Sequence, residues 1–121
     1  PADCNSDKAM QIAQDELSAN KNYSVIFSAW DPGALAAKQA AKALGILDKI
    51  FIVGFDGNDA NYRAIKEGEI TATVRQQPHL MGTEGVEIIT KIFNGETEFP
   101  AEKLIPGQVI DKSNVDTVFS E

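Results

Sequence analysis

Short apolar runs alternate with amphipathic helical segments along this chain, and that alternation limits the folds it can adopt. The run "IFIV" at residues 50–53 is apolar at every position, which is typical of a parallel strand covered on both faces. Further apolar runs occur at residues 23–29, at 69–74 and within 102–112. Helical and strand segments follow one another as α-β-α-β-α-β-α-β, which predicts an α/β fold with a doubly wound, mainly parallel sheet.

Residues that favour helix ends bracket the predicted helices. Gly45 and Gly68 are the predicted stops of the second and third helices, because glycine readily adopts the left-handed conformation that ends a helix. A longer fourth helix is predicted from about residue 79 to residue 94. The predicted N-caps of the first three helices are, in order, Asn5 or Ser6, Asp31 and Asp59.

Composition excludes several classes of protein. With 121 residues, 43% of them hydrophobic, the chain suits one globular domain or part of a larger one. The formal net charge of −7 argues against a nucleic-acid-binding protein, because phosphate contacts need clustered Lys and Arg. No apolar stretch approaches the ~18 residues of a membrane span. A single cysteine, Cys4, excludes an internal disulfide.

Polar and aromatic side chains follow three of the predicted strands, in the segments "SAWD", "GFDGND" and "VRQQP". Ligands of parallel sheets bind at the carboxyl ends of the strands. We therefore expect the side chains of these segments to reach one rim of the sheet. The residues concerned are Trp30, Asp31, Asp56, Asn58, Arg75 and Gln76.

Asp56 ends an apolar strand, and three kinds of chemistry explain an acid there: phosphate acceptance, metal binding, or recognition of hydroxyl groups. A phosphate acceptor needs a further acidic pair at another strand end, and the sequence offers none. A calcium loop starting at Asp56 would carry Ala60 at its fifth place and Asn61 where glycine is required. Nucleophilic catalysis would need a base, and the sole histidine, His79, follows a proline at a helix start with no evident nucleophile to activate. Recognition is favoured over catalysis or metal binding.

Three residue types at the predicted rim suit a sugar or polyol. The carboxylate of Asp56 accepts two hydrogen bonds from neighbouring hydroxyls, and the amide of Gln76 both donates and accepts. The indole of Trp30 can cover the apolar C–H face of a sugar ring, and a packed core indole is the alternative role for it.

The segment "VGFDGNDANYRAIKEGEITATVRQQPHLMGTEGVEIITKIFNGE" resembles the C-terminal portion of the ribose-type periplasmic sugar-binding proteins. The shared elements are VGFDG, a helix ending in K-x-G, a strand reading A-T-V-x-Q, and P-x-x-M-G-x-x-G-V before a helix closing with N-G. The likeness extends upstream through "PADCNSDKAM" and "VIFSAWDPGALAAKQAAKALG" and downstream to "VIDKSNVD", and so covers essentially the whole chain.

The resemblance implies a periplasmic-binding-protein type I fold with two α/β lobes, of which this chain would supply only part. Residues 1–75 would belong to the C-terminal, sugar-binding lobe. Residues 76–121 would cross the hinge, contribute the return helix of the N-terminal lobe and end in the final strand.

By the same resemblance, Asp56 and Gln76 are expected to bind sugar hydroxyls. Two positions depart from the ribose-type pattern: Trp30 stands where those proteins carry Asn, and Cys4 stands where they carry an aromatic ring. Trp30 is expected to take over stacking on the ring, which favours another monosaccharide or a small polyol over ribose. Asp31 and Cys4 are further candidates at the rim.

The implied function is delivery of a sugar to an ABC permease, without a cofactor and without catalysis. The implied location is periplasmic or extracellular, including a form held at the membrane by a lipoprotein anchor. The alternative is the effector-binding domain of a LacI-type transcriptional repressor, which would require an N-terminal helix-turn-helix segment.

Alone, the chain is expected to expose apolar side chains of its first strand and of the helix around Val86, Ile89 and Phe93. Each such side chain left in water costs about 1.5–3 kcal/mol. The pattern therefore predicts a partner, either the N-terminal lobe or a second copy of the chain.

Overall fold

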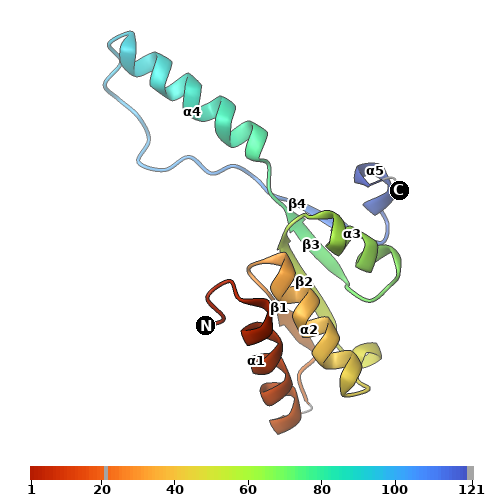
Figure 1. Ribbon diagram of the computed structural model, residues 1–121. Coiled ribbons are helices and arrows are strands. Elements are labelled where there is room, and N and C mark those ends of the chain that lie inside the picture. Colours follow the sequence, from red (N-terminus) through yellow and green to blue (C-terminus); the bar gives the residue numbers. More distant parts are fainter. Residues whose placement is uncertain (21, 120–121) are drawn as a thin grey trace.

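A four-stranded sheet lies at the centre of the fold in a computed structural model that describes residues 1–20 and 22–119 (Figure 1). The sheet order is β1-β2-β3-β4. β1, β2 and β3 run parallel, and β4 pairs antiparallel with β3. The predicted α/β fold with a mainly parallel sheet is confirmed. The strands are β1 (Val25–Phe27), β2 (Phe51–Asp56), β3 (Ala72–Arg75) and β4 (Gln108–Asp111).

Helices cover one face of the sheet. α2 packs on β1 and β2, and α3 packs on β3 and on α2. α1 lies against α2, and α5 lies against α3 (Figure 1). The helices are α1 (Ser6–Ala19), α2 (Asp31–Ala43), the short 3-10 helix η1 (Leu47–Lys49), α3 (Asp59–Lys66), α4 (Pro78–Phe93) and α5 (Val115–Val118).

The N-cap of α1 agrees with the prediction from the sequence, whereas the N-caps of α2 and α3 differ from it. The side chain of Asn5 caps α1 by accepting from the Lys8 amide at 2.9 Å. The predicted cap of α3 is wrong: Asn58 has the extended backbone of an N-cap and accepts from the Asn61 amide at 2.9 Å, whereas Asp59 already lies inside the helix.

The predicted cap of α2 is also wrong. Trp30 occupies the N-cap position and makes no side-chain capping bond, and Asp31 is the first residue of the helix. The physical reason is that the Asp31 carboxylate turns inward and binds other parts of the chain. Gly45 and Gly68, with φ of 67° and 77°, follow α2 and α3 in the predicted left-handed conformation.

The core lies between the sheet and its helices. Ile52 and Ile110 are almost fully buried on the helix-covered face, and Gly54 and Thr73 share that face in register. Leu17 of α1 and Ile65 of α3 pack from the helix side. Alanines fill the contact of α2 with its neighbours, which allows the helices to approach closely: Ala34, Ala37, Ala40 and Ala41 are all buried.

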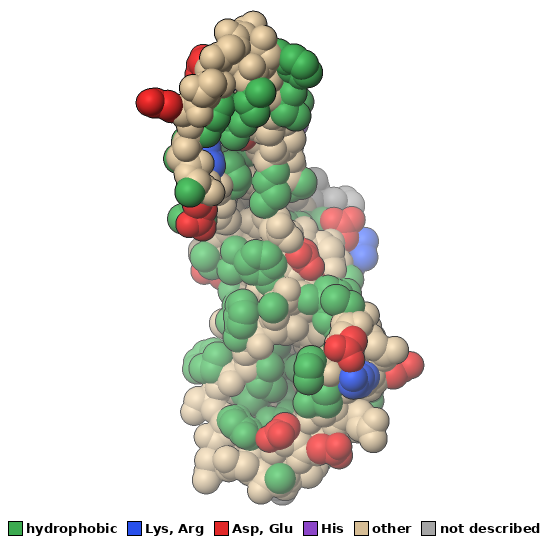
Figure 2. All heavy atoms as spheres, turned by 90° about the vertical axis from the view of Figure 1, so that its left-hand side faces the viewer, with side chains coloured by type: hydrophobic (Ala, Val, Ile, Leu, Met, Phe, Trp, Pro, Cys, Tyr) green, Lys and Arg blue, Asp and Glu red, His purple; other side chains and the backbone are tan. Residues whose placement is uncertain are grey.

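The opposite face of the sheet is apolar and uncovered. Val25 and Phe27 of β1 are 55% and 60% exposed, and Phe51 of β2 is 60% exposed. In β4, Val109 is 57% exposed. Figure 2 shows hydrophobic side chains gathered along one face, from the sheet body to the far end of the molecule. The predicted exposure of the first strand is confirmed.

α4 projects away from the sheet (Figure 1). None of its residues is buried, and the apolar side chains of Val86 and Phe93 are 64% and 87% exposed. The segment that returns to β4 is tied to the start of α4, where Gln77 Nε2 donates to the Pro106 carbonyl at 2.6 Å. The predicted exposure of this helix is confirmed.

In residues 1–20 and 22–119, no helix combines the length and apolarity that crossing a membrane requires.

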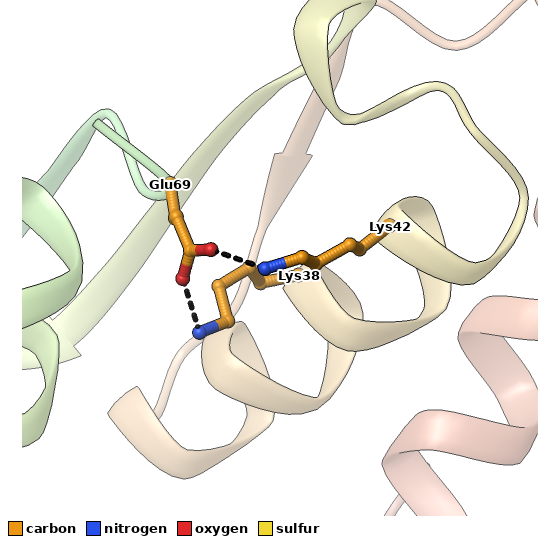
Figure 3. Close-up of polar contacts among 3 residues, drawn as sticks. All are labelled: Lys38, Lys42 and Glu69. Atoms are coloured by element: carbon orange, nitrogen blue, oxygen red, sulfur yellow. Dashed lines mark hydrogen bonds and ion pairs between the residues drawn. The ribbon is translucent and has the colours of Figure 1, made fainter. Parts of the chain in front are cut away.

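An ion-pair cluster joins α2 to the turn that follows α3 (Figure 3). Glu69 accepts from Lys38 Nζ at 2.7 Å and from Lys42 Nζ at 2.6 Å. The hydrogen bonds from Lys38 and Lys42 lower the pKa of Glu69 from its ordinary value of 4.5 to about 2. The cluster therefore stabilises the packing of α2 beside β3 when Glu69 is ionised.

We predict that Glu69→Gln lowers the free energy of unfolding at pH 7 by about 1 kcal/mol, since partly exposed ion pairs are screened by solvent. The pKa of Glu69 is lower in the folded state than in the unfolded state. The stability it contributes is therefore complete above pH 4.5 and is lost as the pH falls toward 2. Urea denaturation at several pH values measures the difference between variant and wild type, which should close in acid.

The matched control is Asp15→Asn, which removes an exposed carboxylate of α1 that forms no ion pair within the described part of the chain. A difference for Glu69→Gln that stays constant down to pH 2 would contradict the role of the ion pairs.

Candidate ligand-binding site

Asp56 is the last residue of β2, at the carboxyl end of the strand, and its backbone is strained. Its φ is 124°, a region that residues with a side chain rarely adopt. Such a conformation costs on the order of 1–3 kcal/mol and persists only where the surrounding structure enforces it. Strained residues of this kind cluster at binding and catalytic sites, so the conformation marks Asp56 as a functional candidate.

Asp56 and Gln76 are joined side chain to side chain and backbone to backbone. The side-chain nitrogen Nε2 of Gln76 donates to Asp56 Oδ1 at 2.6 Å, and the backbone N–H of Gln76 donates to the backbone carbonyl of Asp56 at 3.1 Å. The parallel register of β2 and β3 pairs Asp56 with Arg75, so Gln76 lies one residue beyond the end of the ladder. The predicted meeting of this acid and this amide at one edge of the sheet is confirmed.

A cavity of about 490 Å³ opens beside the pair, where β2 and β3 end and α4 begins. Asp56, Arg75 and Gln76 line it from the strand ends, and Gln77 and His79 line it from the start of α4. The lining therefore contains a carboxylate, two amides, a guanidinium and an imidazole. These groups can donate to and accept from several hydroxyls at once.

Gly57 shapes the wall of this cavity. Its φ is 83°, and a Cβ at this position would lie 2.7 Å from Tyr62 Oη and 2.8 Å from Arg75 Cα. Because the second contact is to backbone, no side chain can be accommodated here without moving β3. Glycine after Asp56 is therefore required by the close approach of the turn to β3.

Trp30 lines a different cavity, of about 480 Å³, which lies between α1, β1 and the N-terminal residues. Its half-buried ring packs over Gly33, where a Cβ would lie 2.6 Å from Trp30 Cε3. Within the described residues, Trp30 therefore does not line the cavity beside Asp56 and Gln76. Its assignment as a ring-stacking residue stays a prediction.

Asp31 is fully buried and does not reach the cavity. Its carboxylate accepts four hydrogen bonds from the protein, two from side chains and two from backbone amides. Burial raises the pKa of Asp31, and the hydrogen bonds from Thr73, Asn58 and Gly57 oppose that rise. The expectation that Asp31 lies at the rim is corrected, because its hydrogen-bonding capacity is used inside the protein.

The remaining rim candidates lie apart from the cavity. Cys4 is exposed in the turn before α1, with φ of 54°, and does not line the cavity beside Asp56. Asn58 uses its side chain to cap α3. A role for Cys4 in ligand binding stays a prediction.

Sequence reasoning missed Gln77 and His79 as lining residues. His79, which follows a proline, is exposed in the first turn of α4. The available signal was position: both residues follow the third strand directly, in "VRQQPH". Among residues 1–20 and 22–119, no three His, Cys, Asp or Glu side chains lie close enough together to hold a metal ion.

Comparison of the chain with known proteins identifies its family. A model of the periplasmic binding protein domain matches residues 1–97. The ribose import binding protein RbsB of Haemophilus influenzae is 40% identical over 96 residues, covering 79% of this chain and 32% of the relative. The D-allose-binding periplasmic protein of Escherichia coli is 30% identical over 111 residues, covering 92% of this chain and 36% of the relative.

Solved structures agree with this relationship. A periplasmic solute-binding protein of an ABC transporter from Actinobacillus succinogenes, with bound D-allose, matches 96% of this chain at 27% identity and a TM-score of 0.82. A solute-binding protein from Bacillus halodurans, with bound myo-inositol, matches 97% at 27% identity and a TM-score of 0.78. In both cases the match covers 40% of the solved chain.

The chain thus spans about a third of the length of the curated relatives it matches, and the matched residues include β2, β3, α4 and the cavity between them. The predicted ribose-type resemblance and the type I fold are confirmed. This chain belongs to the periplasmic binding protein domain family, and within that family it is similar to the ribose-type sugar-binding proteins.

Proposed function

We propose that this chain binds a monosaccharide or a related small polyol in a cleft between two lobes, for delivery to an ABC uptake transporter. The observation that carries the proposal is the hydrogen-bonded pair of Asp56 and Gln76 at the cavity. Two relatives support it, because they are named as binding proteins for ribose and D-allose.

The chemistry of the pair suits neighbouring hydroxyls. The bond from Gln76 uses Asp56 Oδ1, which orients the carboxylate and leaves Oδ2 to accept from a ligand hydroxyl. Hydrogen bonds to a charged acceptor are about twice as strong as those between neutral groups. Gln76 Oε1 is a second acceptor beside it, so two adjacent hydroxyls of a ring can be bound together.

Binding of this kind needs neither a covalent step nor a cofactor. The groups that line the cavity orient a neutral ligand, and closure of two lobes by a hinge motion would enclose it. The site of action we propose is the periplasm or the extracellular surface, and the name of the D-allose-binding periplasmic relative supports the periplasm.

The exposed apolar faces suggest the N-terminal lobe as a partner within the same protein. The uncovered sheet face carries Phe27 and Phe51, and α4 carries Val86, Ile89 and Phe93, all more than half exposed. The curated relatives are about three times as long as the matched region. We propose that residues 1–75 belong to the C-terminal lobe, and that residues 76–121 cross the hinge, contribute α4 to the N-terminal lobe and return in β4, which pairs with β3. Other elements of the N-terminal lobe would then cover α4.

We predict that Asp56→Ala in the full-length protein weakens sugar binding about 100-fold or more, because hydrogen bonds to a charged group contribute roughly 1.5–3 kcal/mol each. Gln76→Ala should weaken it about tenfold, since it removes a neutral amide and the support of Asp56. Thermal-shift screening of monosaccharides and polyols identifies the ligand, and calorimetry then measures its affinity.

Asp15→Asn, on the exposed side of α1, is the control and should bind as wild type does. An Asp56→Ala protein with undiminished affinity would disprove the assignment. Turnover of the ligand that is lost in Asp56→Asn while affinity is retained would instead indicate an enzyme.

We also predict that residues 1–121, purified alone, melt at a temperature that rises with protein concentration, because a second copy can bury the exposed apolar faces. Circular dichroism over about a hundredfold range of concentration measures this. A full-length monomer with concentration-independent melting indicates that the N-terminal lobe covers these faces, whereas a full-length dimer indicates that a second copy covers them. Concentration-independent melting of the isolated chain as a monomer would contradict the prediction.

A further inference from the structure

We propose that Asp31 is a positioning residue for ligand binding: its buried carboxylate holds the turn after β2 so that Asp56 faces the cavity. The inference rests on the proposed function of Asp56. Asp31 lies in the first turn of α2, is 0% exposed and does not line the cavity, so it acts through the turn.

The two oxygens of this carboxylate have different partners. Gly57 and Asn58 are the two residues directly after Asp56. Oδ2 accepts from their backbone amides, at 2.9 Å and 2.8 Å respectively. Oδ1 accepts from Asn61 Nδ2 at 2.5 Å and from Thr73 Oγ1 at 2.6 Å. One oxygen therefore binds the turn, and the other binds α3 and β3.

The bond to Gly57 fixes the peptide group that follows Asp56. The nitrogen end of that peptide donates to Asp31 Oδ2, and its carbonyl end accepts from the Gln76 amide at 3.1 Å. A peptide group held at both ends cannot rotate. The direction of the Asp56 side chain is consequently set by Asp31 on one side and by the strand ladder on the other.

The strain at Asp56 requires such a hold. A φ of 124° is unfavourable for a residue with a side chain, and it would relax if the turn were free. The hydrogen bonds of a buried carboxylate are charge-assisted and about twice as strong as neutral ones. They are therefore suited to keep Asp56 in its strained conformation before a ligand arrives.

The two glycines around Asp56 fit the same device. A Cβ at Gly54 would lie 2.2 Å from Asp31 Oδ1 and 2.5 Å from Asn61 Nδ2, so glycine leaves the space that the carboxylate occupies. Gly57 allows the turn to approach β3 and present its amide to Asp31. The "VGFDG" segment is thus built around a buried acid that is distant in sequence.

Hydrogen exchange in the ligand-free full-length protein tests the hold without any sugar. We expect the amides of Gly57 and Asn58 to exchange at least about 100-fold more slowly than the amide of Asp59, which has no hydrogen bond within the described residues. NMR measures each amide separately. Exchange of Gly57 and Asn58 as fast as that of Asp59 would overturn the proposal.

Three variants then connect the hold to binding. Asp31→Ala removes both sets of bonds, and Asp31→Asn leaves one acceptor oxygen for four donors. Thr73→Val removes only the bond from Thr73 Oγ1 to Oδ1 and keeps the bonds from Asn61 and from both backbone amides of the turn, so it is the matched control. The probes are D-ribose, D-allose and myo-inositol, and affinity, exchange and melting temperature are measured for each variant that folds.

The expected result is that affinity follows the protection of Gly57 and Asn58. Asp31→Ala should lose their protection and bind about tenfold or more weakly, whereas Thr73→Val should melt lower yet bind within about threefold of wild type. Affinity that follows the melting temperature, or an Asp31 variant with unprotected amides and wild-type affinity, overturns the proposal. A wild type that binds no probe counts against the proposed function, while exchange in the variants still tests the hold on the turn.

Discussion

The parallel pairing of β2 with β3 is the constraint on which the candidate site depends. It places Asp56 opposite Arg75, and the backbone N–H of Gln76 continues the ladder by donating to the backbone carbonyl of Asp56. An acid and an amide that are 20 residues apart in the chain thereby come within 2.6 Å of each other. A shift of the register by one residue would turn Asp56 to the other face of the sheet and separate the pair.

Polar links hold α2 to β3 at one end and to the turn after α3 toward the other, and small side chains fill the space between them. At its N-terminus Asp31 binds Thr73 of β3, and toward its C-terminus Lys38 and Lys42 bind Glu69. The alanines between these links bring the helix close to β2 without filling much volume. A buried acid is costly to desolvate, so its four hydrogen bonds are needed to offset the burial. The same acid then connects the helix to the turn that carries Asp56.

The chain has one apolar surface that is buried within the described residues and another that is exposed to solvent. The helix-covered face of the sheet buries Ile52 and Ile110 almost completely. The other face and α4 leave Phe51 and Phe93 in contact with solvent, and Figure 2 shows such side chains running along one side of the molecule. The continuous apolar run of β2 already indicated cover on both faces, since a strand with one solvated face would alternate.

The sequence by itself determined the order of α1 to α4 and β1 to β4, the mainly parallel sheet and the acid at the end of β2, because helical and strand periodicities and glycine stops are local properties. The pairing of Asp56 with Gln76 also followed, since strand ends of a parallel sheet share an edge. The short helices η1 and α5 were not predicted. Only the tertiary structure decided that Trp30 lies in another cavity and that Asp31 binds the turn after β2 rather than capping α2. Spacing in the chain reports which residues end an element, whereas the direction of a side chain depends on which distant donors the packed fold brings to it.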